Sequence, residues 1–248
     1  MTERRDREKQ GASFDAVAEL YEAVRPGYPT WAVEWLVPSG ARVVVDVGAG
    51  TGKFTRLLQR PGREISAVEP SQHMREQLVK ALPGIHALPG SGEHIPLEDG
   101  SVDVVTFAQA WHWVDKEDAS REVARVLRPG GILGLIWNLR DERVDWVREL
   151  GSAMRADGDG FTDATGRADV RGPFSDPERA DFPWLARYTR SGLLDLVRSR
   201  SYFILMSPEE QSATLAAVNE VLDGHAQTAG SEFFDLPYVT VCFRFTRP

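Results

Sequence analysis

The sequence predicts a doubly wound α/β fold, with a mostly parallel sheet and helices on both of its faces. Between residues 43 and 138, segments with the pattern of buried strands alternate with segments of helical periodicity, which is typical of this fold class. The first strand segment, residues 43–47, is rich in β-branched residues, as expected of a strand buried on both sides. Gly48, Gly50 and Gly52 follow it and lead into a helix. Because glycine tolerates positive φ and lacks a Cβ, this turn lets a ligand approach amides at the start of a helix.

The other elements are predicted in order along the chain. Ahead of the first strand we expect an amphipathic helix, a turn rich in proline and a short helix, at residues 13–24, 25–29 and 30–36. The alternating region then holds strands at residues 65–69, 85–88, 102–107 and 132–138, with helices at 54–58, 71–82 and 115–127. Past residue 138 we expect helices at 144–154, 191–197 and 207–223, loop-forming residues at 157–177, and strands at 201–206 and 238–246.

These elements divide the chain into four predicted parts. The first consists of N-terminal lid helices, the second of an α/β core that binds the ligand, the third of a cap or substrate insertion, and the fourth of the segment that completes the sheet. Their boundaries are residues 1–38, 39–138, 139–200 and 201–248.

The details of the glycine turn restrict the kind of ligand. The phosphate-binding loop needs a hydroxyl residue after its lysine, but Phe54 follows Lys53. The dinucleotide pattern also fails, because the third glycine comes one residue too early. Asp46 precedes the turn and would repel a pyrophosphate, yet it can meet a cationic ligand directly or through water. Glu69 ends the next strand, where a carboxylate suits the hydroxyls of a ribose.

These residues, together with two later motifs, resemble the class I S-adenosylmethionine (SAM)-dependent methyltransferases. The resemblance rests on the stretch from Asp46 to Gly52, on Glu69, and on residues 92–105 and 124–133. It covers roughly residues 40–138 in the order of the family. It implies a Rossmann-like sheet of seven strands, in which the last strand lies antiparallel between the fifth and the sixth, and SAM as the cofactor.

The resemblance also implies a set of cofactor-binding residues around the carboxyl ends of the strands. Met74 would lie beside the adenine while serving mainly as a core residue, and Gly92, Glu93 and His94 would present a loop to it; His94 is equally well explained as an ordinary loop histidine. The full set is Asp46, Gly48, Ala49, Gly50, Gly52, Glu69, Met74, Gly92, Glu93, His94 and Ala108. No metal site is expected.

Two aromatic groups are candidates for the acceptor site. The stretch after the fourth strand holds Trp111, His112 and Trp113, and resembles a subset of small-molecule methyltransferases with a His-Trp pair at this place. Since ligands bind beyond the carboxyl ends of parallel strands, these side chains are expected to line the transfer site, although one indole is expected to pack against the next helix. In the lid, Tyr21, Arg25 and Tyr28 are candidates for substrate binding. The alternative is that the two tyrosines only pack against the fold and that Arg25 is a solvated charge.

The composition of the chain limits the kinds of partner that it is expected to bind. The net charge of −8 and pI near 5.2 disfavour a protein that neutralises nucleic-acid phosphates. A single cysteine, Cys242, excludes an internal disulfide and is expected to be buried and inert. No apolar run approaches the length of a membrane span, and the charged start lacks a signal-peptide pattern. We therefore expect a cytoplasmic protein without a nucleic-acid or membrane partner; a homodimer is left open.

The resulting functional prediction is a SAM-dependent methyltransferase that acts on a small molecule by SN2 displacement. A base within hydrogen-bond reach would help a hydroxyl acceptor, and His112 is the first candidate for a catalytic residue. A carboxylate acceptor would instead need a cationic clamp, for which Arg25 or an arginine of the cap could serve. Three alternatives remain: a SAM-binding protein without methyl transfer, a methyltransferase acting on a macromolecule, and an NAD-type oxidoreductase, which the glycine spacing and Asp46 disfavour.

Overall fold

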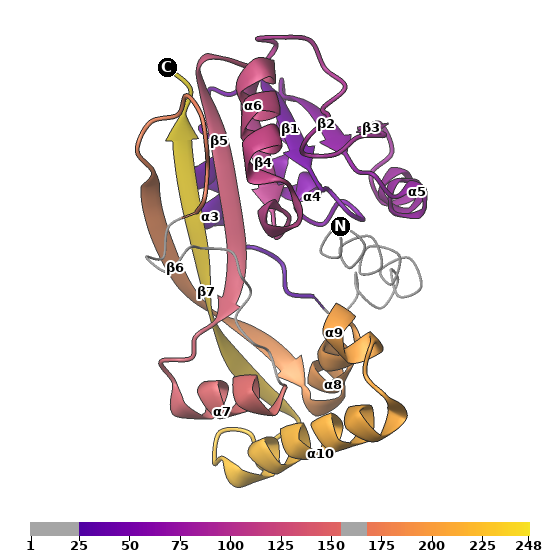
Figure 1. Ribbon diagram of the computed structural model, residues 1–248. Coiled ribbons are helices and arrows are strands. Elements are labelled where there is room, and N and C mark those ends of the chain that lie inside the picture. Colours follow the sequence, from indigo (N-terminus) through magenta and orange to yellow (C-terminus); the bar gives the residue numbers. More distant parts are fainter. Residues whose placement is uncertain (1–24, 155–167) are drawn as a thin grey trace. The chain divides into compact units, whose positions relative to one another are not determined.

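The computed structural model describes residues 25–154 and 168–248, and Figure 1 shows its ribbon. Its sheet has seven strands in the order β3-β2-β1-β4-β5-β7-β6. The strands are β1 Val43–Val47, β2 Glu64–Val68, β3 His86–Leu88, β4 Val102–Ala108, β5 Leu127–Arg140, β6 Glu178–Thr189 and β7 Phe233–Thr246. The helices are α3 Thr30–Leu36, α4 Thr55–Leu58, α5 Gln72–Ala81, the 3₁₀ turn η1 Trp111–Trp113, α6 Lys116–Val126, α7 Asp145–Ala153, α8 Arg190–Arg198, α9 Ser201–Ile204 and α10 Pro208–Gly224.

The predicted parallel core is confirmed. β1 pairs in parallel with β2 and β4, β2 with β3, and β4 with β5. Residues 44–47 of β1 are all buried, as are the apolar residues of β4 from Val102 to Phe107, because helices cover both faces of a parallel sheet. The carboxyl ends of β1, β2 and β4 consequently meet at one edge of the sheet, where the glycine turn begins.

The last strand has the position that the family resemblance implied. β7 lies between β5 and β6, and Figure 1 shows it running against β5. Asp141 N donates to Pro237 O, and Arg247 N donates to Gly131 O. Both bonds belong to one antiparallel register, in which Arg140 of β5 lies opposite Tyr238 of β7. Cys242 of β7 is fully buried, and burial raises the pKa of its thiol.

The described residues fall into two compact units, whose boundary runs through the three long strands. The sheet unit comprises residues 27–138, 168–182 and 240–248. The helical unit comprises residues 25–26, 139–154 and 183–239. Each has its own apolar core: that of the helical unit is built by α7, α8, α10 and the adjoining strand ends, with Trp146, Leu150, Leu193, Leu196, Val218 and Leu222 among its buried members.

One predicted strand was wrong. Residues 201–206 were expected to form the sixth strand, but residues 201–204 form the short helix α9. The sixth strand is instead β6, in the segment that we had placed in the cap. An apolar run this short does not by its periodicity distinguish a strand from a helix. β6 contains Pro183, which breaks the appearance of a strand but is tolerated because β6 lies at the edge of the sheet.

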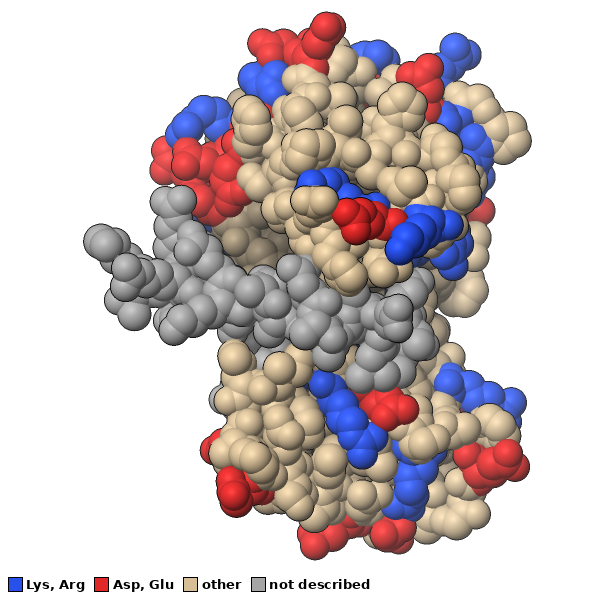
Figure 2. Space-filling view, turned by 90° about the vertical axis from the view of Figure 1, so that its right-hand side faces the viewer, with Lys and Arg blue, Asp and Glu red and all other residues tan. Residues whose placement is uncertain are grey.

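On the face shown in Figure 2, acidic and basic side chains of the described residues are interspersed, and neither charge dominates. Among the described helices, none is both long and apolar enough to cross a membrane. Nor do the described His, Cys, Asp and Glu side chains form a group of three or more that could hold a metal ion.

Candidate functional site

The glycine turn after β1 combines tight packing with one open backbone position. Gly48, Gly50 and Gly52 have φ values of 68°, 56° and 90°, in the left-handed region that favours glycine. A Cβ on Gly48 would lie 2.6 Å from the Cβ of Ala110, and one on Gly52 would lie 2.9 Å from Leu82 Cδ1. A Cβ on Gly50 would meet no atom within 4 Å. The outer glycines therefore allow the chain to pack, whereas Gly50 presents bare backbone to open space.

Glu69 connects this turn to the start of α5. Its Oε2 accepts a hydrogen bond from Gly50 N at 2.9 Å, and its Oε1 accepts one from Ser71 N at 2.9 Å. The side chain is buried, with 8% of the residue exposed. These two hydrogen bonds hold the Glu69 carboxylate in one orientation beside the backbone of Gly50.

Asp46 lies beneath the turn and not on its surface. It is fully buried, and its oxygens accept hydrogen bonds from Thr55 Oγ1 at 2.6 Å and Thr106 Oγ1 at 3.0 Å. Burial raises the pKa of Asp46 to about 7, and the nearby charge of Glu69 adds to the rise, while the two threonine hydrogen bonds oppose it. No part of Asp46 is exposed for direct contact with a ligand in this conformation.

Met74 occupies the first turn of α5. It is 6% exposed, and its N donates to Ser71 Oγ, which caps the helix. Its place in the core agrees with the helical spacing. Ala49 is buried beside the turn, and Ala108 ends β4 with a half-buried side chain.

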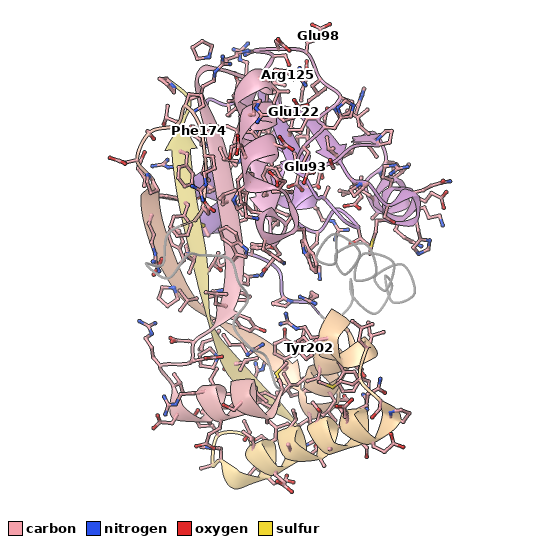
Figure 3. The ribbon with its side chains drawn as sticks, in the orientation of Figure 1. Glu93, Glu98, Glu122, Arg125, Phe174 and Tyr202 are labelled. Atoms are coloured by element: carbon pink, nitrogen blue, oxygen red, sulfur yellow. The ribbon has the colours of Figure 1, made fainter. Side chains whose placement is uncertain are left out.

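The segment after β3 is fastened to α6, and this clamp was missed by the sequence analysis. Glu93 Oε1 accepts from Asp115 N at 2.8 Å, and Glu122 Oε1 accepts from Ile95 N at 2.8 Å. Arg125 donates to Ile95 O at 2.9 Å, to Leu97 O at 2.8 Å and to Glu122. Figure 3 shows Glu93, Glu122 and Arg125 in a row along α6. A carboxylate and a guanidinium one turn apart on α6 thus hold main-chain groups of this segment; the pair Glu122 and Arg125 at i, i+3 was the only signal in the sequence.

Within this segment the three candidates differ in what surrounds them. A Cβ on Gly92 would lie 2.5 Å from Val114 Cγ1, so Gly92 is required for packing. Glu93 is engaged with the start of α6, and His94 is exposed, with its main chain bonded to Ser91. The segment therefore offers a ligand its backbone and His94 more readily than the carboxylate of Glu93.

The aromatic cluster after β4 divides into buried and half-buried rings. Trp111 is fully buried: its Nε1 donates to Asp169 O at 2.9 Å, and its ring contacts Phe107 edge to face at 4.8 Å. This is the indole expected to pack internally. His112 and Trp113 are half-buried neighbours, with ring centroids 4.9 Å apart. They remain the candidates of this cluster that an acceptor can reach.

Gln109 fixes the turn that carries this cluster. It is the only non-glycine residue with positive φ in the described part of the chain, at 56°. Gln109 N donates to Ile136 O, and its Nε2 donates to Asn138 O. Asn138 in turn donates to Gly27 O at 2.8 Å and accepts from Thr240 Oγ1 at 2.6 Å. Backbone strain of this kind is often found at ligand sites, and nothing in the residue pattern indicated it.

The lid candidates are only partly covered by the structure. Tyr28 lies next to the glycine turn, with its ring 5.0 Å from that of Phe54, edge to face. Arg25 belongs to the helical unit and its Nε is buried. Tyr21 lies outside the described residues.

Comparison with known proteins places this arrangement in a family. Residues 45–135 match a methyltransferase domain family. An uncharacterized methyltransferase of Mycobacterium tuberculosis (strain ATCC 25618 / H37Rv) is 48% identical over 97% of this chain and 98% of its own. An uncharacterized methyltransferase-like protein of Schizosaccharomyces pombe is 33% identical over 90% of this chain and 91% of its own. The chain belongs to the class I SAM-dependent methyltransferases.

Solved structures show the same fold for the methyltransferase. One is a proposed type II methyltransferase from Anaeromyxobacter dehalogenans, with a TM-score of 0.69 and 23% identity over 90% of this chain and 97% of that one. Another, from Haemonchus contortus, is a phosphoethanolamine-type N-methyltransferase in complex with phosphomonomethylethanolamine and S-adenosylhomocysteine, with a TM-score of 0.56 and 15% identity over 99% of this chain and 60% of that one. The family match covers β1 to β5, and hence the glycine turn, Glu69 and the clamp on α6, but stops before the helical unit.

Proposed function

We propose that the methyltransferase binds SAM at the carboxyl ends of β1, β2 and β4 and transfers its methyl group to a small-molecule acceptor. The observation that carries this proposal is the pair formed by Gly50 and Glu69. The backbone of Gly50 faces open space, and the carboxylate beside it is oriented by two amides. This arrangement suits a nucleoside whose sugar hydroxyls donate to Glu69 and whose chain passes over Gly50.

The remaining residues of the site fit a cationic sulfur nucleoside. Met74 supplies a thioether against which a base can pack, and the clamped segment around His94 supplies main-chain groups. Asp46 and Glu69 are both carboxylates, so the field at this edge of the sheet favours a positive charge. That preference is the reverse of what a pyrophosphate cofactor would require.

The chemistry of methyl transfer makes few demands on the protein. A sulfonium carries its own leaving group, so the chain has to align the acceptor and exclude water. Alignment of this kind can lower a barrier by about 7–11 kcal/mol. We assign to His112 the role of taking a proton from a hydroxyl or amine acceptor, and to Trp113 and Tyr28 that of supplying ring faces that attract a cation.

The net charge of −8 disfavours a nucleic-acid acceptor. The name of one relative is consistent with an acid as the acceptor: a malonyl-[acyl-carrier protein] O-methyltransferase of Methylococcus capsulatus, named for a malonyl group carried on a protein, is 37% identical over half of this chain.

Calorimetry with SAM, S-adenosylhomocysteine and NAD tests the cofactor. We expect heat with the first two nucleosides and none with NAD; the absence of heat with both sulfur nucleosides would overturn the proposal. Detection of S-adenosylhomocysteine during incubation with small carboxylic acids, phenols and amines then separates an enzyme from a protein that only binds SAM.

A matched pair of glycine variants tests the place of binding. Gly50 and Gly62 both have positive φ, and a Cβ on either would meet no atom within 4 Å. Alanine at either position should therefore cost a similar ~1–2 kcal/mol of stability. Gly50→Ala should in addition weaken S-adenosylhomocysteine binding at least tenfold, whereas Gly62→Ala should leave it unchanged. Equal affinities of the two variants would place the nucleoside elsewhere.

A further inference from the structure

The helical unit contains a buried arginine whose charge has no close counterpart. The side chain of Arg140, at the end of β5, is 7% exposed. Its Nε is buried, and no described group accepts a hydrogen bond from it. The nearest carboxylate oxygen is that of Glu142, at 3.9 Å, and the Glu142 side chain is half-exposed. That contact is too long for a hydrogen bond.

A second arginine of the same unit, Arg200, also has a buried Nε without a described acceptor. Arg200 follows α8. No ion pair joins Arg200 to any carboxylate among the described residues. This contrasts with Arg190 and Arg198 of the neighbouring helix, which pair with Asp223 at 2.5 Å and Asp195 at 2.7 Å. Carboxylate partners for arginine are thus present in this unit, yet none of the described ones pairs with Arg200.

Two tyrosines, Tyr188 and Tyr238, lie in the surroundings of these arginines. Burial raises the pKa of Tyr188, the neighbouring Tyr238 adds to the rise, and the positive charges of Arg200 and Arg25 oppose it. Tyr238 lies opposite Arg140 across β5 and β7, and Trp184 stacks on it at 5.4 Å. The hydroxyl of Tyr238 is buried and close enough to that of Tyr188 to raise its pKa, although the two do not form a hydrogen bond of good geometry. Tyr202 of α9, labelled in Figure 3, packs against the same core.

The cost of burying these arginines indicates what kind of ligand the cluster would bind. A guanidinium is always charged and carries five donors in a fixed fork. Leaving buried donors unsatisfied costs stability, and more so when the group is charged. Arg140 lies opposite the buried Tyr238, and Arg200 carries its charge near Tyr188. Since no described carboxylate accepts a hydrogen bond from either arginine, the two offer donors and positive charge to an oxyanion.

We propose that the helical unit binds the acceptor through an anionic group, a carboxylate or a phosphate, held by Arg140, Arg200 and the hydroxyl of Tyr238. The substrate is then a small organic acid or phosphate ester. Trp184 and Tyr188 contribute apolar and aromatic surface for the rest of the molecule. This inference rests on the proposed function, and it assigns the substrate class that the function leaves open.

The test uses the full chain and four probes: succinate, citrate and phenyl phosphate, with succinamide as the uncharged control. Calorimetry is carried out in the presence of saturating S-adenosylhomocysteine and at matched ionic strength. We expect at least one anion to bind and succinamide not to bind. Arg140→Gln and Arg200→Gln should each weaken that anion roughly tenfold or more, because each removes charge-assisted hydrogen bonds. Arg187→Gln removes an exposed arginine of β6 and should have no effect.

Each outcome bears on one proposal alone. If S-adenosylhomocysteine binds but no anion does, or if Arg187→Gln weakens the anion as much as the other variants, the anion site is overturned and the methyltransferase is not. If S-adenosylhomocysteine fails to bind, the proposed function falls first. Arg200→Lys, which keeps the charge but loses the fork, guards against a folding artefact. It should bind the anion with an affinity between those of the wild type and Arg200→Gln, while S-adenosylhomocysteine affinity and the melting temperature stay unchanged.

Discussion

The two units of this methyltransferase treat buried charge in opposite ways. In the sheet unit, Glu69 and Asp46 are both buried, and both accept hydrogen bonds from the protein. In the helical unit, Arg140 and Arg200 have buried Nε groups that no described acceptor meets, and neither donates to a described carboxylate. Arg244 of the sheet unit also has such an Nε, but its other nitrogens donate to Trp35 O and to Glu178. Under the two proposals above, the cofactor site is ordered before its ligand binds, whereas the donors of the anion site gain partners only from the ligand.

Methyl transfer requires two kinds of binding, one for the cofactor and one for the acceptor. A cofactor common to a large family can be held by a fixed geometry, and the family match covers the proposed cofactor residues from Asp46 to Ala108. Acceptors differ between enzymes, and the anion site that we propose lies in the unit beyond the match.

The carboxylate of Glu69 should be the most sensitive point. Glu69→Gln places an amide NH₂ against the N–H of Gly50 or of Ser71, which leaves a buried donor unsatisfied at a cost of about 1–3 kcal/mol. The variant also loses the charge that accepts from a ribose. We expect calorimetry to show S-adenosylhomocysteine bound roughly 100-fold more weakly or worse.

The matched control is Glu64→Gln, at the exposed start of the same strand. It should change the affinity less than twofold. If Glu69→Gln behaved like this control, the carboxylate would serve the fold and not the ligand.

Asp46 should make stability fall with rising pH. Its pKa is raised from 3.8 to about 7, so between these values the folded state binds more protons than the unfolded state does. The free energy of unfolding therefore declines through this window and levels off above it. With ~1.4 kcal/mol per pKa unit, the two pH units between pH 5 and the raised pKa mean that wild type should lose about 3 kcal/mol relative to Asp46→Asn between pH 5 and pH 8. Urea unfolding at both pH values measures this, and parallel profiles for the two proteins would refute it.

The clamp on α6 should have a smaller effect. Arg125→Gln removes donors to Ile95 O, Leu97 O and Glu122, and should lower the free energy of unfolding by about 1–2 kcal/mol, because part of the side chain is exposed. Cofactor affinity should fall less than for Glu69→Gln, since Arg125 positions the segment and does not touch the ligand.

Arg121→Gln serves as its control. Arg121 also lies on α6 and pairs with two acidic residues, yet it is largely exposed, so urea unfolding should show a change within about 0.5 kcal/mol. Equal losses for Arg121→Gln and Arg125→Gln would mean that charge on α6, and not the clamp, stabilises this segment.

The sequence was most informative where local chemistry decides the structure. The glycine turn, the position of Glu69 and the alternation of buried strands with helices all leave a pattern within a short window, and the fold class was predicted from them. The start of α10 is local in the same sense: Ser207 forms a capping box, and Pro208 stands at the first helical position.

What could not be predicted depends on pairings between distant segments. β6 was missed because its alternating residues include Pro183 and an exposed Leu185, a pattern acceptable only at a sheet edge. Trp111 and Trp113 stand two residues apart, yet one indole is fully buried and the other is half-exposed. The pairing of Arg140 with Tyr238 depends on the register of β5 and β7, which no local periodicity encodes.

The single thiol of the chain has a practical use that follows from its position. Cys242 lies within β7, between its two neighbouring strands, and none of its surface is exposed. An alkylating reagent can reach the sulfur only after the apolar cluster around Cys242, which residues of α3 and β1 help to form, has opened. The rate of alkylation therefore reports how often this cluster opens in the native protein, without any engineered label, and slower alkylation on addition of a ligand would measure how firmly that ligand keeps the cluster closed.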